Sequence, residues 1–451
     1  MIFGKKLGRY AAAALAFLLV LTLTFQAPFA SKAQAAQDTL GLKAKSAILI
    51  DFNSGQILYE KNADKRYPPA SMTKMMTEYL VMQALHSKKI TWNTKVPVSD
   101  YVYQISQNRS FSNVPLRKDY QYTVKELYEA MAIYSANGAT IALAEKVGGS
   151  EKNFVDLMNK TAKKFGMTGA HYINSSGLDN VDLGKFAPYG GPNSSNELSA
   201  RDIAKLAYHV INDYPEALNI SKIPLKSFTA GIVAPNKPIQ MVNWNYMLPG
   251  FGVNMDKFKY EGVDGLKTGH TDLAGYCFTG TVNRNGHRLI SVVMGTSSDA
   301  QRFEQTRALF DYGYQQFSEK ALAKKNQLIK GQKAVAVHNG KQDQVKVAFG
   351  KSYSTAVANG EKVSTKFKVV LDRSKLNKDG QLEAPVKKGE TIGYATPVSK
   401  GNAQYGQLYD NNNKIPVIAA EQVDKNNWFV RLFKGIGSVF GSLFSWIAGL
   451  F

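Results

Sequence analysis

Three short motifs occur in a fixed order along the chain and constrain it more than any other feature. They are Ser71-Met72-Thr73-Lys74, Ser135-Ala136-Asn137 and Lys267-Thr268-Gly269. A Ser-x-x-Lys at the start of a helix places the lysine amine one turn from the serine hydroxyl, within reach of its proton. Each motif alone is weak, but chance rarely produces all three in this order. The sequence therefore predicts a serine nucleophile that is activated by a lysine.

The N-terminal residues have the pattern of a secretory signal peptide. Three basic residues lie within the first nine positions, an apolar run covers positions 11–30, and Ala33-Gln34-Ala35 supplies the small residues of a cleavage site. We expect residues 1–35 to be removed on export. A retained membrane helix is the alternative interpretation.

The charge of the chain restricts its partners. The formal net charge is +21, and removal of residues 1–35, which hold four Lys or Arg and no acidic residue, leaves +17. Such a surface attracts polyanions, and for an exported protein these are anionic lipids and wall polymers. A solvated basic surface without a dedicated partner is the alternative. No nucleic-acid-binding motif is found, so we expect no nucleic-acid partner.

The elements around the motifs predict an α+β domain over residues 36–317. A helix is expected from Ser71 to Leu85, which places the nucleophile at a helix N-terminus. The Ser-Ala-Asn motif falls on a loop between helices at 123–133 and 139–147. The third motif lies on an edge strand of an antiparallel sheet flanked by helices. The expected strands are 47–51, 56–60, 263–268, 275–282 and 288–295, and further helices are expected at 152–165, 200–212 and 300–317.

The composition changes after this domain. Short alternating strands separated by Asn-Gly and Asp-Gly turns predict a small all-β sandwich over residues 318–422. From 423 to 451 apolar residues recur every three or four positions with basic and small residues between them, which predicts an amphipathic helix in a bilayer interface. A helix packed on the β-domain and a short spanning segment are the alternatives.

Taken together, these features resemble the low-molecular-weight penicillin-binding proteins, specifically the serine-type D-alanyl-D-alanine carboxypeptidases with a C-terminal membrane anchor. Three further stretches are similar to that family: Gly166-Met167-Thr168, the run 174–179 (Asn-Ser-Ser-Gly-Leu-Asp) and Ser199-Ala200-Arg201-Asp202. The resemblance implies a penicilloyl-serine transferase fold. It also implies removal of the terminal D-alanine from peptidoglycan stem pentapeptides, acylation by β-lactams and a role in cell-wall biogenesis. The enzyme would work at the outer face of the cytoplasmic membrane, held peripherally by its C-terminal helix on the anionic lipid surface.

The residues of the motifs can be given roles in this chemistry. Ser71 would attack the penultimate carbonyl, and Lys74, kept neutral by burial and by the charge of Lys267, would take its proton. Ser135, linked to Lys267, would pass a proton to the leaving amine, and Asn137 would orient Lys74 and the substrate amide.

The third motif would bind the substrate. Lys267, Thr268, Gly269, His270 and Thr271 are the substrate-binding residues that we predict. The family's pattern makes the backbone N–H groups of Ser71 and His270 the oxyanion hole. We expect no metal ion and no organic cofactor, because the six histidines lack metal-ligand spacing. Cys277 is expected in the core, and a thiol whose modification blocks the site is the alternative.

One residue of the chain departs from the pattern of this family, and two other functions compete with the one that the resemblance implies. Some members of the family have an arginine that binds the substrate carboxylate in an Asn-Arg-Asn stretch, whereas this chain has Asn243-Trp244-Asn245. A β-lactamase shares the fold but needs a carboxylate that activates the deacylating water, and class A enzymes supply it in Glu-x-x-x-Asn. Here Glu197 is followed at that spacing by Arg201. A non-catalytic wall-binding scaffold is a second competing function.

Overall fold

The structure is a computed structural model that describes residues 38, 40–231, 237–251, 256–361, 364–400, 406–409 and 414–427. The predicted signal peptide lies outside these residues. So does the predicted C-terminal helix from residue 428 onward. Within the described part of the chain, no helix is long and apolar enough to cross a membrane.

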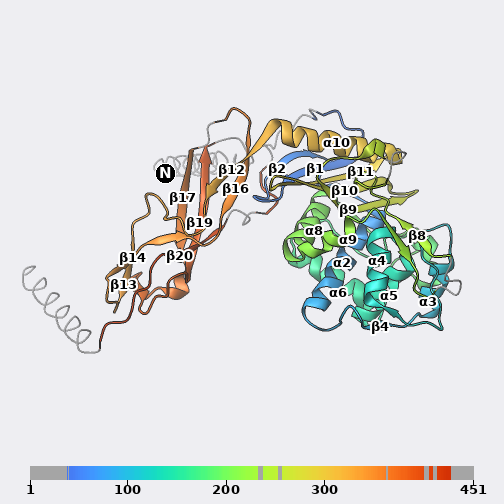
Figure 1. The fold of residues 1–451 in the computed structure, drawn as a ribbon, viewed down its shortest axis with the longest axis horizontal. Helices are drawn as coiled ribbons and strands as arrows, with labels where there is room; N and C mark the ends of the chain where they lie inside the picture. Colours follow the sequence, from blue (N-terminus) through green and yellow to red (C-terminus); the bar gives the residue numbers. More distant parts are fainter. Residues whose placement is uncertain are drawn as a thin grey trace, which may run out of the picture. The chain divides into compact units, whose positions relative to one another are not determined.

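The N-terminal domain, residues 40–316, is built around a five-stranded antiparallel sheet with the order β2-β1-β11-β10-β9. Every residue of β1 is buried, because helices cover both faces of the sheet. Figure 1 shows α10 along one face and the remaining long helices on the other. The strands of this sheet are β1 (Ser46–Asp51), β2 (Ile57–Lys61), β9 (Val263–Thr271), β10 (Gly275–Arg284) and β11 (His287–Thr296).

The helices pack around a large apolar core. Nine of the twelve residues of α5 are buried, so this helix lies inside the helical layer rather than on its surface. Capping boxes start α4 at Thr123 and α8 at Ser199.

The α-helices are α2 (Lys74–His86), α3 (Asp100–Gln107), α4 (Val124–Tyr134), α5 (Asn137–Gly148), α6 (Glu151–Lys164), α7 (Asn180–Leu183), α8 (Ala200–Asp213), α9 (Leu218–Ser221) and α10 (Asp299–Gln316). The 3-10 helices are η1 (Ala70–Thr73), η2 (Gly184–Phe186), η3 (Pro215–Ala217) and η4 (Asp256–Phe258). Three small antiparallel pairs are β3 (Arg66–Tyr67) with β6 (Leu198–Ser199), β4 (Lys95–Val96) with β5 (Tyr122–Thr123), and β7 (Leu225–Phe228) with β8 (Ile239–Val242).

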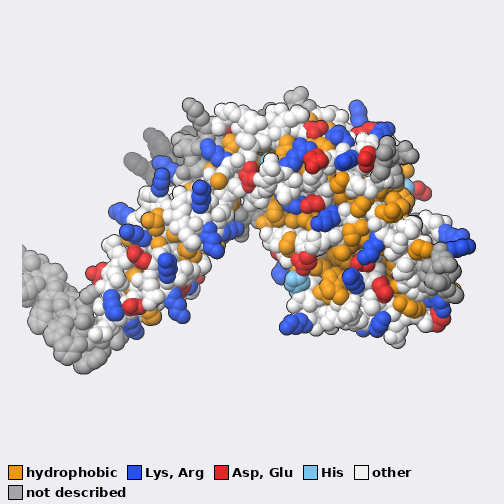
Figure 2. Space-filling model, viewed as in Figure 1, with side chains coloured by type: hydrophobic (Ala, Val, Ile, Leu, Met, Phe, Trp, Pro, Cys, Tyr) orange, Lys and Arg blue, Asp and Glu red, His pale blue; other side chains and the backbone are white. Residues whose placement is uncertain are grey.

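The β-rich domain, residues 317–427, has an apolar core of its own. Its strands form one four-stranded sheet, β15-β20-β19-β17, one three-stranded sheet, β14-β13-β18, and the pair β12-β16. The elements are β12 (Phe317–Ala323), β13 (Val335–His338), β14 (Gln344–Val345), β15 (Val347–Phe349), β16 (Tyr353–Ala358), β17 (Ser364–Leu371), η5 (Arg373–Lys375), β18 (Leu382–Glu383), β19 (Thr391–Lys400) and β20 (Ile415–Ala419). Lys and Arg side chains are spread over the visible face of the molecule in Figure 2.

The sequence predicted the α+β class and the all-β region correctly, with some differences at the boundaries. The helix expected from Ser71 begins as η1 and becomes α-helical at Lys74. Val423 is fully buried and bridges Val386, and Lys425 bridges Gly340. These contacts extend the β-rich domain to at least Lys425, beyond the expected boundary at 422. α3 and the β7-β8 pair were not expected, since both are short: α3 has eight residues, and β7 and β8 have four each.

Candidate active site

Ser71 lies in η1, at the point where the sheet meets the helical layer. Two glycines allow neighbouring segments to approach this turn. A Cβ atom on Gly269 of β9 would lie 2.5 Å from the carbonyl oxygen of Pro69, and one on Gly177 would collide with the carbonyl oxygen of Ala70. Gly177 also has φ +82°, a conformation that glycine adopts without strain. The glycines of the third motif and of the 174–179 run therefore bring both segments against the nucleophile.

Lys74 is buried at the start of α2 and makes three close polar contacts. Its Nζ lies 2.8 Å from Ser71 Oγ, 2.8 Å from Asn137 Oδ1 and 2.7 Å from the carbonyl oxygen of Ser176. Burial lowers the pKa of Lys74 well below its usual value, and the positive charge of Lys267 lowers it further. Both effects favour the neutral form of the amine.

A neutral amine has two N–H groups and one lone pair. The oxygens of Asn137 and Ser176 are acceptors only, so they take the two N–H groups of Lys74. The lone pair of the neutral amine then faces Ser71 Oγ, which lies 2.8 Å from Nζ, a distance that allows transfer of the hydroxyl proton. In this arrangement Lys74 is placed so that it could accept the proton of Ser71.

The second motif lies at the break between α4 and α5. Ser135 ends α4 in a left-handed conformation with φ +62°, and Asn137 is the first residue of α5. Asn137 Nδ2 donates to the carbonyl oxygen of Ser112 at 3.1 Å, which turns its oxygen toward Lys74. Ser135 Oγ is buried at the cleft but has no hydrogen-bond partner among the described residues. The expected link between Ser135 and Lys267 is thus not a hydrogen bond in this structure.

The third motif lies on β9, the edge strand of the sheet, as the sequence predicted. Lys267 is buried, and its Nζ donates to the carbonyl oxygen of Thr268 at 3.1 Å. Burial lowers the pKa of Lys267 to about 7, with a smaller contribution from the charge of Arg302, whereas the carboxyl of Glu78 opposes the shift. Lys267 therefore titrates near neutral pH.

A cavity of about 830 Å³ lies in front of Ser71. Thr268, Gly269, His270 and Thr271 form one wall of it, and Ser135 and Asn137 also line it. The His270 ring is near that of Tyr276, with 4.0 Å between centroids, and burial lowers the pKa of His270. The structure therefore brings four of the five expected substrate-binding residues into one cavity with Ser71, whereas Lys267 lies buried outside its lining.

Two residues of the cavity wall were not given a role by the sequence. Trp244 lines the cavity, and its Nε1 donates to the carbonyl oxygen of Tyr134 at 3.3 Å. Arg302 of α10 is buried behind β9, donates to the carbonyl oxygen of Gly269 at 3.2 Å and pairs with Asp299. Arg302 is 35 residues from the third motif in a helix of ordinary pattern, so no sequence signal points to it.

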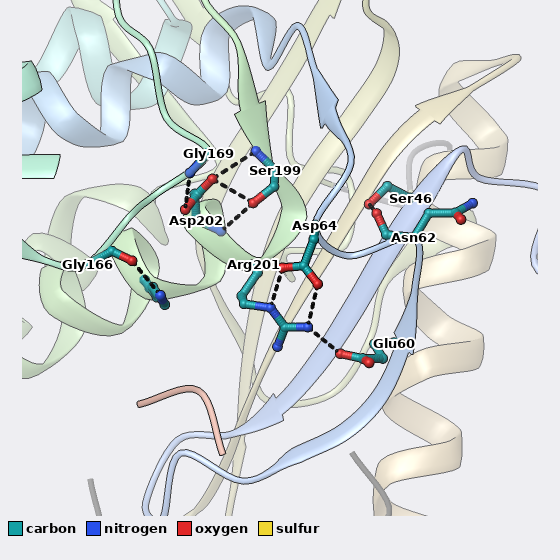
Figure 3. Close-up of polar contacts among 10 residues, drawn as sticks. Ser46, Glu60, Asn62, Asp64, Gly166, Gly169, Ser199, Arg201 and Asp202 are labelled. Atoms are coloured by element: carbon teal, nitrogen blue, oxygen red, sulfur yellow. Dashed lines mark hydrogen bonds and ion pairs between the residues drawn. The ribbon is translucent and has the colours of Figure 1, made fainter. Parts of the chain in front are cut away.

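The two residues considered for a β-lactamase, Glu197 and Arg201, lie away from the cavity in front of Ser71. Arg201 forms ion pairs with Glu60 and Asp64, which hold the start of α8 to the β2-β3 region (Figure 3). Neither Glu197 nor Arg201 lines the cavity.

Cys277 is fully buried, and burial raises its pKa to about 11, so its thiol is not available to reagents in the folded protein. Across the described ranges, no group of three or more His, Cys, Asp or Glu side chains could hold a metal ion.

Comparison with known proteins agrees with this geometry. Residues 31–298 match the D-alanyl-D-alanine carboxypeptidase family, peptidase S11, and residues 317–425 match the C-terminal domain of penicillin-binding protein 5. The chain belongs to the D-alanyl-D-alanine carboxypeptidase family. It is a low-molecular-weight penicillin-binding protein and a carboxypeptidase of the serine type.

Relatives of this carboxypeptidase match along most of their length. The D-alanyl-D-alanine carboxypeptidase DacF of Bacillus subtilis is 31% identical over 422 residues, covering 93% of this chain and 96% of that protein. DacC of Escherichia coli is 32% identical, covering 93% and 95%. Among solved structures, a peptidoglycan synthesis regulatory factor (PBP3) from Streptococcus pneumoniae has a TM-score of 0.74 at 34% identity, covering 85% of this chain and 100% of that one.

Proposed function

We propose that this carboxypeptidase removes the terminal D-alanine of peptidoglycan stem pentapeptides through an acyl intermediate on Ser71, with Lys74 as the base. The observation that carries the proposal is the environment of Lys74 Nζ. It lies 2.8 Å from Ser71 Oγ, and both of its N–H groups have carbonyl acceptors. The only direction left for its lone pair is toward the serine hydroxyl.

Acylation then follows from the geometry. Ser71 Oγ attacks the carbonyl carbon of the penultimate residue as its proton moves to Lys74. The backbone N–H groups of Ser71 and His270 hold the oxyanion, each contributing roughly 3 kcal/mol to the transition state. The C–N bond breaks, and Ser135, whose hydroxyl has no other partner among the described residues, delivers its proton to the departing amine and takes up the proton held by Lys74, so that Lys74 is neutral again. Water then hydrolyses the ester with Lys74 as base.

The substrate carboxylate needs a cation because the chain has Trp244 in place of the arginine of some relatives. Thr268 lines the same wall as the oxyanion donor, and Lys267 is buried beside it with its Nζ 3.1 Å from the carbonyl oxygen of Thr268, so the pair is suited to receive the carboxylate. Arg302 adds positive potential from behind β9. Trp244 supplies an apolar wall instead of an ion pair.

β-Lactams contain an amide that Ser71 can open in the same way. The amine released by ring opening stays attached to the acyl group, so it cannot diffuse away as D-alanine does. We therefore expect penicillin to form an adduct on Ser71 that lasts for minutes or longer. Mass spectrometry with peptide mapping tests this, and a parallel reaction with a stem pentapeptide must release D-alanine.

A Ser71→Ala variant separates this function from that of a non-catalytic scaffold. It should lose both the penicillin adduct and the release of D-alanine. An adduct that maps to another residue, or hydrolysis of pentapeptide that persists in Ser71→Ala, would contradict the proposal.

Lys74→Ala should lose acylation and hydrolysis together, by about 10²- to 10⁴-fold, because one amine serves both steps. Stopped-flow measurement with a fluorescent penicillin gives the acylation rate, and decay of the adduct gives the second step. If the variant hydrolyses an existing acyl-enzyme at the normal rate, Lys74 is not the deacylation base.

The site of action is also part of the proposal. The sequence of residues 1–35 supports export, and that of residues 428–451 supports peripheral attachment to the outer face of the cytoplasmic membrane. The peptidoglycan substrate is found on that side.

A further inference from the structure

The carbonyl of Ser176 is one of the two acceptors that fix the direction of the lone pair of Lys74, and it is presented by a turn. This turn, residues 174–177, lies about a hundred positions after Lys74 in the sequence. It contacts the amine of Lys74 through a backbone carbonyl and not through a side chain. The contacts that hold this turn therefore set the direction in which the lone pair of Lys74 points. The Ser71-Lys74 chemistry proposed above is assumed here.

The turn is anchored from several sides. Thr77 Oγ1 of α2 donates to the carbonyl oxygen of Ser175 at 2.8 Å, one turn of helix after Lys74. Asn174 Oδ1 accepts from the backbone N–H of Gly177 at 2.7 Å and shapes the turn from within. Asn196 Nδ2 donates to the carbonyl oxygen of Asn174 at 3.1 Å.

The remaining anchor is a carboxylate. Glu151, the first residue of α6, directs its side chain inward, and its Oε1 accepts from the backbone N–H of Ser175 at 2.9 Å and from Ser175 Oγ at 2.6 Å. Glu151 is 5% exposed and forms no ion pair within the described ranges. It lies outside the wall of the cavity, so it does not contact substrate there.

A carboxylate in this position is costly to bury without a cation. Helix N-termini accept acidic residues readily, but such residues normally remain in water, where the helix dipole favours them at no desolvation cost. Both hydrogen bonds to Glu151 Oε1 come from the one residue that precedes the Ser176 carbonyl. The carboxylate thus fixes Ser175, the residue before the one whose carbonyl oxygen Lys74 contacts.

We propose that Glu151 is a positioning residue for the reaction: by holding Ser175, it aims the Ser176 carbonyl at Lys74 and so directs the lone pair of the base toward Ser71. The role depends on the reach of the side chain and its acceptor oxygen, and not on its charge. Two conservative variants separate these properties. Glu151→Gln keeps the length and one acceptor oxygen but loses the charge, whereas Glu151→Asp keeps the charge but is one methylene shorter.

The experiment measures acylation by a fluorescent penicillin, kcat and KM on a pentapeptide, and the melting temperature of each variant. We expect Glu151→Asp to lose about tenfold or more in acylation rate and kcat, a part of the 10²–10⁴ that base catalysis supplies. Its KM should stay within about twofold, because Glu151 does not touch substrate. Glu151→Gln should retain rates within about threefold of the native enzyme.

A matched control is Glu145→Gln. Glu145 is a neighbouring, partly buried carboxyl on α5 that accepts from Ser99 Oγ at 3.1 Å. This variant should leave acylation unchanged. If it slows acylation as much as Glu151→Asp does, the effect is general loosening of the helices, and the positioning role is wrong.

The remaining outcomes decide between the positioning role of Glu151 and its alternatives. Native rates in Glu151→Asp, or a loss in Glu151→Gln equal to or larger than that in Glu151→Asp, would overturn the proposal. If Glu151→Asp does not fold, Glu151→Gln still decides, since a tenfold loss in it shows that charge and not reach is needed. If the native enzyme itself gives no adduct on Ser71, it is the proposed function that fails. An adduct on Ser71 without the expected order of variants removes the positioning role alone.

Discussion

At the scale of single residues, this site depends on two buried lysines that must carry different charges. Two ammonium groups in one poorly hydrated cleft repel each other, so one of them gives up its proton. Lys74 is the more affected, whereas Glu78 supports the charge of Lys267, whose pKa is about 7. Glu78 is itself buried, and its pKa is raised to about 7. The proposed base, Lys74, and the proposed carboxylate receptor, Lys267, thus differ in pKa because their surroundings differ.

This separation predicts how substrate binding depends on pH. Lys267 is charged below its pKa of about 7 and loses its charge as the pH rises through that value. A substrate with a free carboxylate should therefore bind less well at higher pH. We expect KM to rise above pH 7 by up to about tenfold per pH unit, while kcat does not fall, because burial lowers the pKa of Lys74 well below its usual value. Initial rates between pH 6 and 9 measure both constants.

The control for this prediction is Lys267→Arg. An arginine keeps its charge throughout this range, so the KM of the variant should be independent of pH even if its absolute value is higher. A KM of the native enzyme that is constant from pH 6 to 9 would show that Lys267 does not receive the carboxylate.

At the scale of elements, the site is a contact between the edge strand β9 and the 3-10 turn η1. The contact is close because Gly269 has no side chain: a Cβ there would lie 2.5 Å from the carbonyl oxygen of Pro69 and 3.2 Å from the backbone nitrogen of Met72. These are backbone atoms and cannot rotate away. The distance between the two proposed oxyanion donors, the N–H groups of Ser71 and His270, is therefore set by a glycine.

Gly269→Ala should push β9 away from η1 and open the oxyanion hole. The expected loss is about 10²- to 10³-fold in acylation rate, comparable with the removal of one oxyanion donor. Fluorescent-penicillin kinetics measure it, and circular dichroism shows whether the variant is folded. Gly191→Ala is the matched control, because nothing lies within 4 Å of a Cβ at that position. Acylation of folded Gly269→Ala at the native rate would refute the argument.

Much of this element-level arrangement could be predicted, because the motifs coincide with strong local patterns. The edge strand, the helix break at Ser135 and the helix after Ser71 follow from turn residues and helical periodicity. The acceptor for Lys74 at Ser176 could not be predicted, since a backbone carbonyl has no sequence signature. Arg302 and Glu151 were missed for a related reason: each acts through tertiary contacts, and in the sequence each is an ordinary charged residue of a helix.

At the scale of the whole molecule, the chain combines an enzyme with a basic exterior and a second domain. The β-rich domain carries nineteen Lys and Arg against ten Asp and Glu between residues 318 and 427. It has its own core, and its last described residues are tied into it: the backbone N–H of Asn426 donates to the carbonyl oxygen of Asn339 at 2.8 Å. A chain that ends after Asn427 therefore keeps the whole of that described domain.

The remaining residues, 428–451, have the sequence of an interfacial helix, and this predicts where the enzyme attaches. Burial of each large apolar side chain contributes roughly 1.5 to 3 kcal/mol before ordering costs, and each basic residue about 1 kcal/mol on an anionic leaflet. We expect the chain that ends at Asn427 to be soluble and active on small peptides, whereas the full mature chain floats with anionic vesicles. Aspartate at both Phe440 and Phe444 should release it, and Ser438→Asp on the polar face should do so less. Equal vesicle binding by the truncated and full-length proteins would move the attachment to the basic surface of the two domains.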